Sequence, residues 1–190
     1  DRGERATLIA EAAKAFGPMT ALVNNASGYE RDSIFDLEEA LWDRHFAVHA
    51  EAPLFLARDF AAQLPDGADG NIVNIIDERL LHLSPAYMSY TLSKSVLWTA
   101  TRTMAQALAP RSRVNAIGPG PTLRPHGARE EQWSEAQRRL PLGRGATPGE
   151  IAEGLLFILS ARSMTGQMLV LDGGEHLEFP EWRKPTPRRP

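Results

Sequence analysis

The feature that most constrains this chain is the alternation of two hydrophobic periods along its sequence. Apolar residues recur at helix spacing in five segments, residues 4–16, 37–63, 84–108, 129–139 and 148–161. Short apolar runs of strand type lie between or after them, at residues 20–23, 71–76, 113–117 and 168–171. Strands that alternate with helices pair in parallel, because the helix provides the crossover that a parallel pair requires. The pattern therefore predicts an α/β fold with a mainly parallel sheet.

The composition excludes several classes of protein. A chain of 190 residues suffices for one domain and is short for two. It has no cysteine, which excludes a disulfide framework, a thiolate nucleophile and a zinc–thiolate site, and its five histidines show no metal-ligand spacing. The net charge of −3 gives no electrostatic reason for a nucleic-acid partner. No apolar run approaches the roughly 20 residues that span a bilayer, so we expect a cytoplasmic protein with no membrane partner.

A tyrosine and a lysine stand four residues apart in the helix expected at 84–108. Tyr90 and Lys94 therefore share one helix face. A free phenol has a pKa near 10, and a cation within about 5 Å would draw that pKa toward neutral, while the same lysine keeps donors for a cofactor hydroxyl. The alternative is a helix whose Tyr and Lys merely extend to solvent. The pair indicates a proton donor and its activating cation.

The same helix carries only two charged residues, Lys94 and Arg102, between Ser84 and Leu108. A helix with so few charges needs burial on more than one face. We expect one face to pack on the sheet and another on a second subunit, which would make a homo-dimer or homo-tetramer.

Four motifs stand in the order in which one known family carries them. They are Asn24-Asn25-Ala26-Ser27 after a strand, the strand 72–76 followed by Tyr90 and Lys94, the run Val114 to Gly120, and Thr165-Gly166 with Asp172-Gly173-Gly174. On these motifs residues 1–177 resemble a single domain of the short-chain dehydrogenase/reductase family. The resemblance implies a Rossmann-like, doubly wound, mainly parallel sheet with helices on both faces. It also implies an NAD(P)-dependent oxidoreductase in which Tyr90 and Lys94 are catalytic and bind the cofactor.

Asp77 stands 13 residues before Tyr90, where most of that family has a serine. A carboxyl there is similar to the pteridine reductases and dihydromonapterin reductases, as are Ser27 and the aromatic Tyr29, which would stack on a pterin. Reducing a ring C=N needs a proton on nitrogen, and a carboxyl can give a proton when neutral or accept N–H bonds when ionised. Asp77 and Tyr90 should then titrate as a coupled pair. The alternatives are a helix or loop cap for Asp77 and an ordinary surface aromatic for Tyr29.

The cofactor residues follow from the resemblance. It assigns Asn25, Ala26 and Ser27 to the cofactor, together with the turn Pro119-Gly120 and the hydroxyl of Thr122. The branch implies NADPH, with NAD as the alternative. Without the other motifs, Pro119-Gly120 would be read as a plain turn. His49 stands where the family usually has an asparagine that anchors a relay water, and we interpret it as a structural histidine.

The chain begins at Asp1, without methionine and already in a helical pattern. The glycine-rich turn after the first strand of a dinucleotide fold is not in this sequence. We therefore expect the N-terminal βαβ portion to be missing from the chain, which would leave it inactive alone. Residues 178–190 form a Pro/Arg-rich segment that we expect to be an extension at the surface.

Three functions remain open from the sequence. The first is NADPH-dependent reduction of a dihydropterin, with Tyr90 as proton donor and Asp77 facing ring nitrogens. The second is reduction of a carbonyl, such as a 3-oxoacyl thioester or a sugar-like ketone. The third is a catalytically silent dimerising module. The first requires Asp77, Tyr90 and Lys94 to meet in one pocket beside Tyr29. The exact substrate and the direction of the reaction are not set by the sequence.

Overall fold

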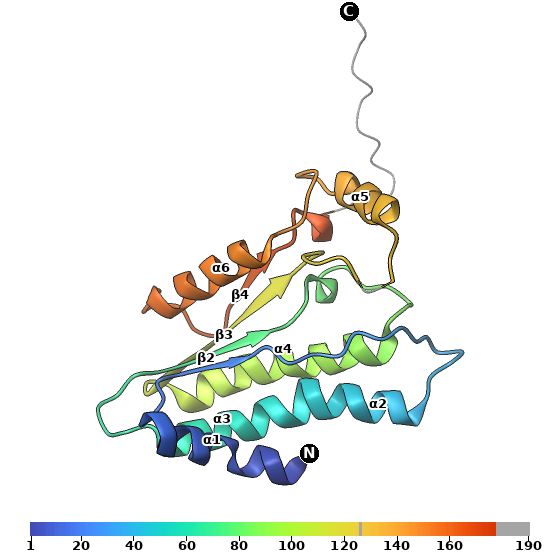
Figure 1. The fold of residues 1–190 in the computed structure, drawn as a ribbon. Helices are drawn as coiled ribbons and strands as arrows, with labels where there is room; N and C mark the ends of the chain where they lie inside the picture. Colours follow the sequence, from blue (N-terminus) through green and yellow to red (C-terminus); the bar gives the residue numbers. More distant parts are fainter. Residues whose placement is uncertain (126, 178–190) are drawn as a thin grey trace, which may run out of the picture.

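The sheet is parallel throughout. The structure is a computed structural model, and it describes residues 1–125 and 127–177. Four strands lie in the order of the chain, β1 (Ala21–Asn24), β2 (Gly70–Ile75), β3 (Ser112–Pro119) and β4 (Met168–Leu171). Each pairs in parallel with the next (Figure 1). The expected α/β architecture is confirmed.

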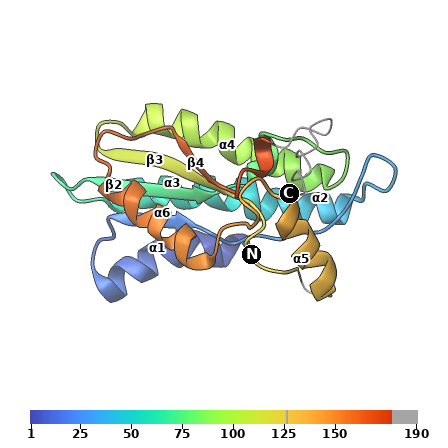
Figure 2. The same cartoon turned by 90° about the horizontal axis from the view of Figure 1, so that it is seen from above.

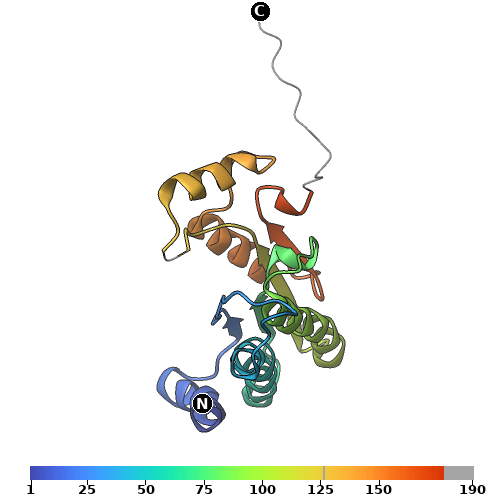
Figure 3. The ribbon, with the colours of Figure 1, turned by 90° about the vertical axis from the view of Figure 1, so that its right-hand side faces the viewer.

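Helices cover both faces of the sheet. On one face, α1 (Arg2–Phe16) packs along α3 (Ala52–Gln63), and α4 (Met88–Leu108) packs against β3. On the other face, α6 (Pro148–Ser160) contacts β3 and β4 (Figures 2 and 3). The short helix α5 (Glu130–Arg139) lies beyond the carboxyl ends of the strands.

Successive strand residues point to opposite faces, and the core divides accordingly. On β2, Ile72 is in the cluster with Phe60 of α3, whereas Val73 is in the cluster with Ile158 of α6. All four side chains are fully buried. The alternation fixes which polar strand residues reach each helix, and Asn74 accordingly donates to Thr101 of α4.

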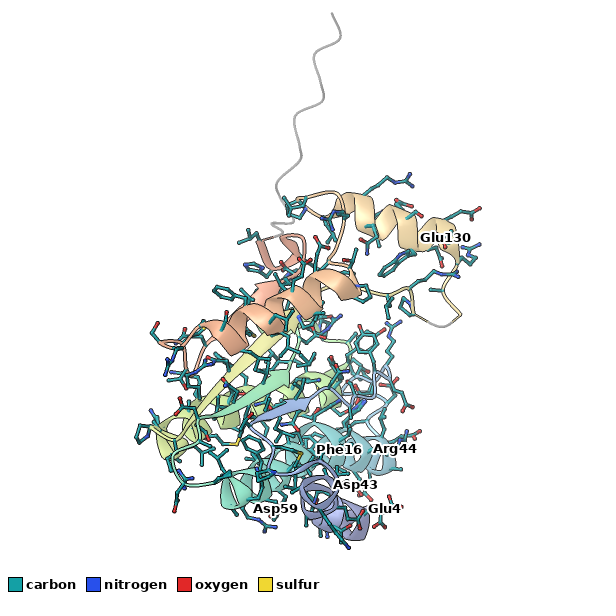
Figure 4. All side chains as sticks on the ribbon, turned by 60° about the vertical axis from the view of Figure 1, so that its left-hand side comes forward. Glu4, Phe16, Asp43, Arg44, Asp59 and Glu130 are labelled. Atoms are coloured by element: carbon teal, nitrogen blue, oxygen red, sulfur yellow. The ribbon has the colours of Figure 1, made fainter. Side chains whose placement is uncertain are left out.

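The helix expected at 37–63 is interrupted by a π-helical turn. It consists of α2 (Glu39–Phe46), a π segment (Ala47–Glu51) and then α3. Pro53 has no N–H to donate to the carbonyl of His49, and a proline ring clashes with the carbonyl four residues earlier. The backbone widens instead, so that Ala52 N–H bonds to Ala47 O. On α2, Asp43 and Arg44 face solvent (Figure 4). The next residue, His45, is buried.

The helix expected from Ser84 begins only at Met88. Tyr87 is left-handed, with φ 60° and ψ 45°, and therefore cannot belong to the helix. Its N–H donates to Asp32 O at 2.8 Å, and the Asp32 carboxylate accepts the N–H of Ser89. A residue distant in sequence thus caps α4 in place of a local side chain. The other expected boundaries differ by a few residues.

One expectation concerns a segment that the structure does not describe, and another concerns helices that could span a membrane. The Pro/Arg-rich segment 178–190 lies outside the described residues. Within residues 1–125 and 127–177, none of the helices combines the length and apolar character that crossing a bilayer demands.

Candidate active site

Three loops and one helix meet at the carboxyl ends of β1, β2 and β3. Residues 25–29 follow β1, residues 76–80 follow β2, and residues 120–122 follow β3. The first turns of α4 pack beside them. In open parallel sheets this edge is where ligands bind, because loops from neighbouring strands converge there.

Asp77 and Tyr90 are directly hydrogen bonded. Asp77 follows β2, and its Oδ2 accepts the phenolic O–H of Tyr90 at 2.6 Å. Its Oδ1 accepts the N–H of Arg79 at 2.8 Å and caps the 3₁₀ turn Glu78–Leu80. The cap that we considered as the alternative role is therefore real, and the same carboxylate contacts the tyrosine with its other oxygen.

The pKa of Tyr90 is raised strongly, mainly by burial and then by the charge and hydrogen bond of Asp77. Only 4% of Tyr90 is exposed. The sequence led us to expect the opposite direction, from the influence of Lys94. The difference arises because the Asp77 carboxylate bonds the phenol itself, whereas the ammonium lies 5.7 Å from the ring centroid. The phenol is accordingly neutral over the physiological range.

Lys94 lies on the same side of α4 as Tyr90, but its ammonium bonds elsewhere. Nζ donates to the carbonyl of Ile75 at 2.8 Å. The side chain is almost fully buried, and burial lowers the pKa of Lys94 to about 8. Nζ makes no other hydrogen bond to the residues that the structure describes, so two of its three donors remain for another acceptor.

All three tyrosines of the chain gather at this site. Tyr29 stacks on Tyr87, with ring centroids 4.4 Å apart, and meets Tyr90 edge-on at 4.9 Å. Arg79 donates to Tyr29 Oη at 2.9 Å and lies 5.0 Å from the Tyr87 ring centroid. Tyr29 stays 45% exposed. It therefore stands beside the Asp77–Tyr90 pair, stacked on Tyr87 and with nearly half of its surface exposed.

The loop after β1 is held by a buried histidine. Asn25, Ala26 and Ser27 are exposed beyond the strand end. Ser27 Oγ lies 2.9 Å from Nε2 of His49, and Gly28 N–H also reaches that nitrogen. This contact of His49 was not foreseen from the sequence.

The turn after β3 is shaped by a close approach of two backbones. A Cβ on Gly120 would lie 2.6 Å from Cβ of Asp172, so only glycine fits there. Gly120 N–H donates to Leu171 O, and the Thr122 hydroxyl donates to Gly120 O at 3.0 Å. Pro119 and Gly120 therefore lie at the site edge for a packing reason, and the Thr122 proton is already used within the turn.

Two acidic side chains, Glu78 and Glu175, border the site near the segment that follows β4. Burial, and then the charge of Glu175, raises the pKa of Glu78 to about 8. Oε2 of Glu78 is buried without a partner among the described residues. Neither acid was singled out from the sequence. Glu78 follows Asp77 in an ordinary polar run, and its burial depends on where the segment after β4 lies.

The donors at these strand ends fit the nicotinamide riboside part of a dinucleotide. Lys94 has two unused protons for a ribose hydroxyl, and the Tyr90 phenol is neutral. The exposed backbone of Asn25 and Ala26 offers further polar groups. No described strand is followed by the glycine-rich turn that binds pyrophosphate.

Comparisons with known proteins agree with this geometry. The family model described as enoyl-(acyl carrier protein) reductase matches residues 1–176. A 3-oxoacyl-[acyl-carrier-protein] reductase of Thermotoga maritima is 31% identical over 180 residues, covering 92% of this chain and 73% of its own. FolM alternative dihydrofolate reductase 1 from Brucella canis, solved in complex with NADP, superposes with a TM-score of 0.90 at 49% identity, covering 96% of this chain and 72% of its own. The Brucella suis protein, also with NADP, gives the same TM-score and identity over 96% and 73%.

Proposed function

Because this chain belongs to the short-chain dehydrogenase/reductase family of oxidoreductases, we propose that its site catalyses the NADPH-dependent reduction of a dihydropterin. The observation that carries the proposal is the 2.6 Å hydrogen bond between Asp77 and Tyr90 with Tyr29 beside it. The similarity to the two FolM structures supports the same substrate class and NADP as the cofactor, with NAD as the alternative.

The bound nicotinamide would supply a hydride to a ring carbon. The chain's own residues would supply the proton and hold the ring. Tyr90, kept neutral by burial, would donate its proton to the adjacent ring nitrogen. The Lys94 ammonium would stabilise the phenolate left behind and bind a ribose hydroxyl. Asp77 would accept a ring N–H, because an ionised carboxylate only accepts.

The remaining assigned residues surround that centre. Tyr29 would stack on the pterin through the exposed part of its ring. Asn25, Ala26 and Ser27 would contact the nicotinamide side of the cofactor from β1, and Pro119, Gly120 and Thr122 from β3. Since Thr122 donates to Gly120 O, its contact with a nicotinamide amide would use the oxygen lone pairs, unless the hydroxyl rotates.

A substrate panel distinguishes the three functions. NADPH oxidation should be followed in a protein that includes the expected N-terminal βαβ portion, with dihydrobiopterin, dihydrofolate and dihydromonapterin, and in parallel with a 3-oxoacyl thioester and a sugar ketone. We expect kcat/KM for the best dihydropterin to exceed that for any carbonyl by at least about 100-fold, since complementary hydrogen-bonding groups discriminate strongly. Faster reduction of the carbonyl substrates would favour the 3-oxoacyl reductase activity named for the Thermotoga relative. Absence of NADPH binding even with the expected N-terminal βαβ portion present would favour a silent module.

We also propose that the protein is a cytoplasmic homo-oligomer. The outer surface of α2, α3 and α4 carries an open apolar groove, lined by Trp42, Phe46, Leu54, Leu92 and Val96 among others. Tyr90 is not among the residues that line this groove. A second copy of the chain would cover it by a two-fold contact.

A further inference from the structure

His49 is buried in the π segment, and both of its ring nitrogens are engaged. Nδ1 lies 2.8 Å from Ser93 Oγ on α4. Nε2 lies 2.9 Å from Ser27 Oγ and accepts the N–H of Gly28 at 3.3 Å. Only 1% of the residue is exposed. His49 thus joins the catalytic helix to the loop after β1 through one ring.

The partners of Ser93 determine which nitrogen carries the proton. Ser93 Oγ lies 2.7 Å from the carbonyl oxygen of Tyr90, which can only accept, so the serine proton is used there. Ser93 Oγ must therefore accept from Nδ1–H of His49. A neutral imidazole with its proton on Nδ1 has a bare lone pair on Nε2. Gly28 N–H and the Ser27 hydroxyl are then the donors to that lone pair, because the other acceptor near Ser27 Oγ, the carbonyl of Gly28, is farther away at 3.4 Å.

The neutral form agrees with the surroundings. Burial, then the charges of Lys94 and His45, lower the pKa of His49 to about 3. The preceding turn repeats the arrangement, because Ser89 donates to the Asp32 carboxylate and must accept from Nδ1–H of His45. The two rings stack 5.5 Å apart, and both meet the Tyr90 ring edge-on.

We infer that His49 is a positioning residue, whose bare Nε2 accepts a hydrogen bond from the Ser27 hydroxyl and leaves the lone pairs of Ser27 Oγ as acceptors at the site. Ser27 itself is exposed at the strand ends, so its lone pairs are open to a ligand. Without His49 the hydroxyl can rotate and donate outward instead. The ligand atom selected is an N–H or O–H donor, whether it belongs to the cofactor or to the substrate. The inference deepens the proposed function and depends on it only in the kinetic part of its test.

Two amide substitutions separate the two contacts of the ring. The amide of asparagine lies near the position of Nδ1, and that of glutamine near the position of Nε2. His49→Asn can keep the bond to Ser93 and loses Ser27. His49→Gln can keep the bond to Ser27 and loses Ser93. His49→Asn also loses the longer bond from Gly28 N–H, so it removes two hydrogen bonds and His49→Gln removes one. Thermal unfolding of both variants checks that they fold.

His49→Asn should have the same kinetic effect as Ser27→Ala. Ser27→Ala should raise the KM for either NADPH or the dihydropterin. We expect His49→Asn to raise the same KM by about 10-fold. The double variant should show no further rise, because the two residues form one interaction. His49→Gln should stay within about threefold of the parent. Equal effects of the asparagine and glutamine variants, or additive effects with Ser27→Ala, overturn the inference.

A spectroscopic measurement tests the same inference without turnover. Nitrogen-15 correlation spectra of the ligand-free protein at pH 7 distinguish a protonated ring nitrogen from a bare one. We expect His49 with its proton on Nδ1 and a hydrogen-bonded Nε2 whose resonance shifts in Ser27→Ala. A proton on Nε2, or an unchanged resonance, contradicts the inference. If the spectrum is as expected and no dihydropterin is reduced, the proposed function alone fails.

Discussion

At the scale of single residues, the site depends on one carboxylate that serves two neighbours. Asp77 caps the turn after β2 with Oδ1 and bonds the Tyr90 phenol with Oδ2. A serine could still cap the turn, because its hydroxyl also accepts a backbone N–H. A serine side chain is neutral, however, so it could not offer an anionic acceptor to the N–H groups of a ring. Function and local stability can therefore be separated at this position.

Asp77→Ser should lower kcat/KM for dihydropterin reduction by at least about 100-fold, the usual size of a lost acid–base or charged contact. Affinity for NADPH should change little, because Lys94 and the loop after β1 are untouched. Steady-state kinetics and cofactor fluorescence titration measure the two effects. Unchanged dihydropterin reduction removes Asp77 from the mechanism.

Glu78 gives the protein a pH-dependent stability. Its folded pKa is raised to about 8, above the ordinary value of 4.5. A carboxyl with a raised pKa binds more protons when folded, so stability falls as pH rises between these two values. Glu78→Gln mimics the protonated form and should remove that fall, which amounts to a few kcal/mol between pH 5 and pH 8 at about 1.4 kcal/mol per pKa unit. Urea unfolding at pH 5 and pH 8 measures it, and parallel pH profiles for both proteins would contradict the assignment.

The residues that the sequence identified are those with a recognisable chemistry and spacing. Tyr90 and Lys94 share a helix face by period alone, and Asp77 lies at a fixed distance before them. Tyr87 and Arg79 could not be found in this way. They reach Tyr29 only through the three-dimensional placement of two loops.

At the scale of elements, helix positions were predictable but their irregularities were not. The apolar period of residues 37–63 continues through the π segment, so it predicts one helix. Pro53 was the one local signal of a break, because it removes a donor within the helix. The start of α4 had no local signal, since its cap comes from Asp32, 57 residues before Ser89.

Asp32 should therefore be a strong determinant of stability. It is 1% exposed and accepts both the N–H and the hydroxyl of Ser89 at the start of α4. Asp32→Ala removes a helix cap and leaves Ser89 without its acceptor, which should cost about 2 kcal/mol or more. Asp32→Asn keeps one acceptor oxygen and should cost less. Denaturant unfolding ranks the two, and a neutral alanine substitution would mean that the first turn of α4 needs no cap.

At the scale of the whole molecule, the sheet and its two helical layers followed from the alternation of periods, because burial on both faces forces parallel strands between helices. This packing leaves some apolar side chains of the helices exposed at the surface. Leu92 and Val96 of α4 are 44% and 39% exposed, and they line the groove with Trp42 and Phe46. Nothing in the apolar period distinguishes such a face from the one that packs on β3.

Pairing of two copies through this groove makes a prediction about assembly. Leu92→Glu places a charge at the centre of an apolar contact, where it would be buried without a partner in the dimer and remain solvated in the monomer. We expect it to shift the molar mass measured by light scattering from an oligomer to a monomer, with thermal unfolding still cooperative. Leu8→Glu is the matched control, because Leu8 is 52% exposed on α1, outside the groove. An oligomer that survives Leu92→Glu and dissociates with Leu8→Glu would place the subunit contact on α1 instead, and the bare face of α4 would then need another partner.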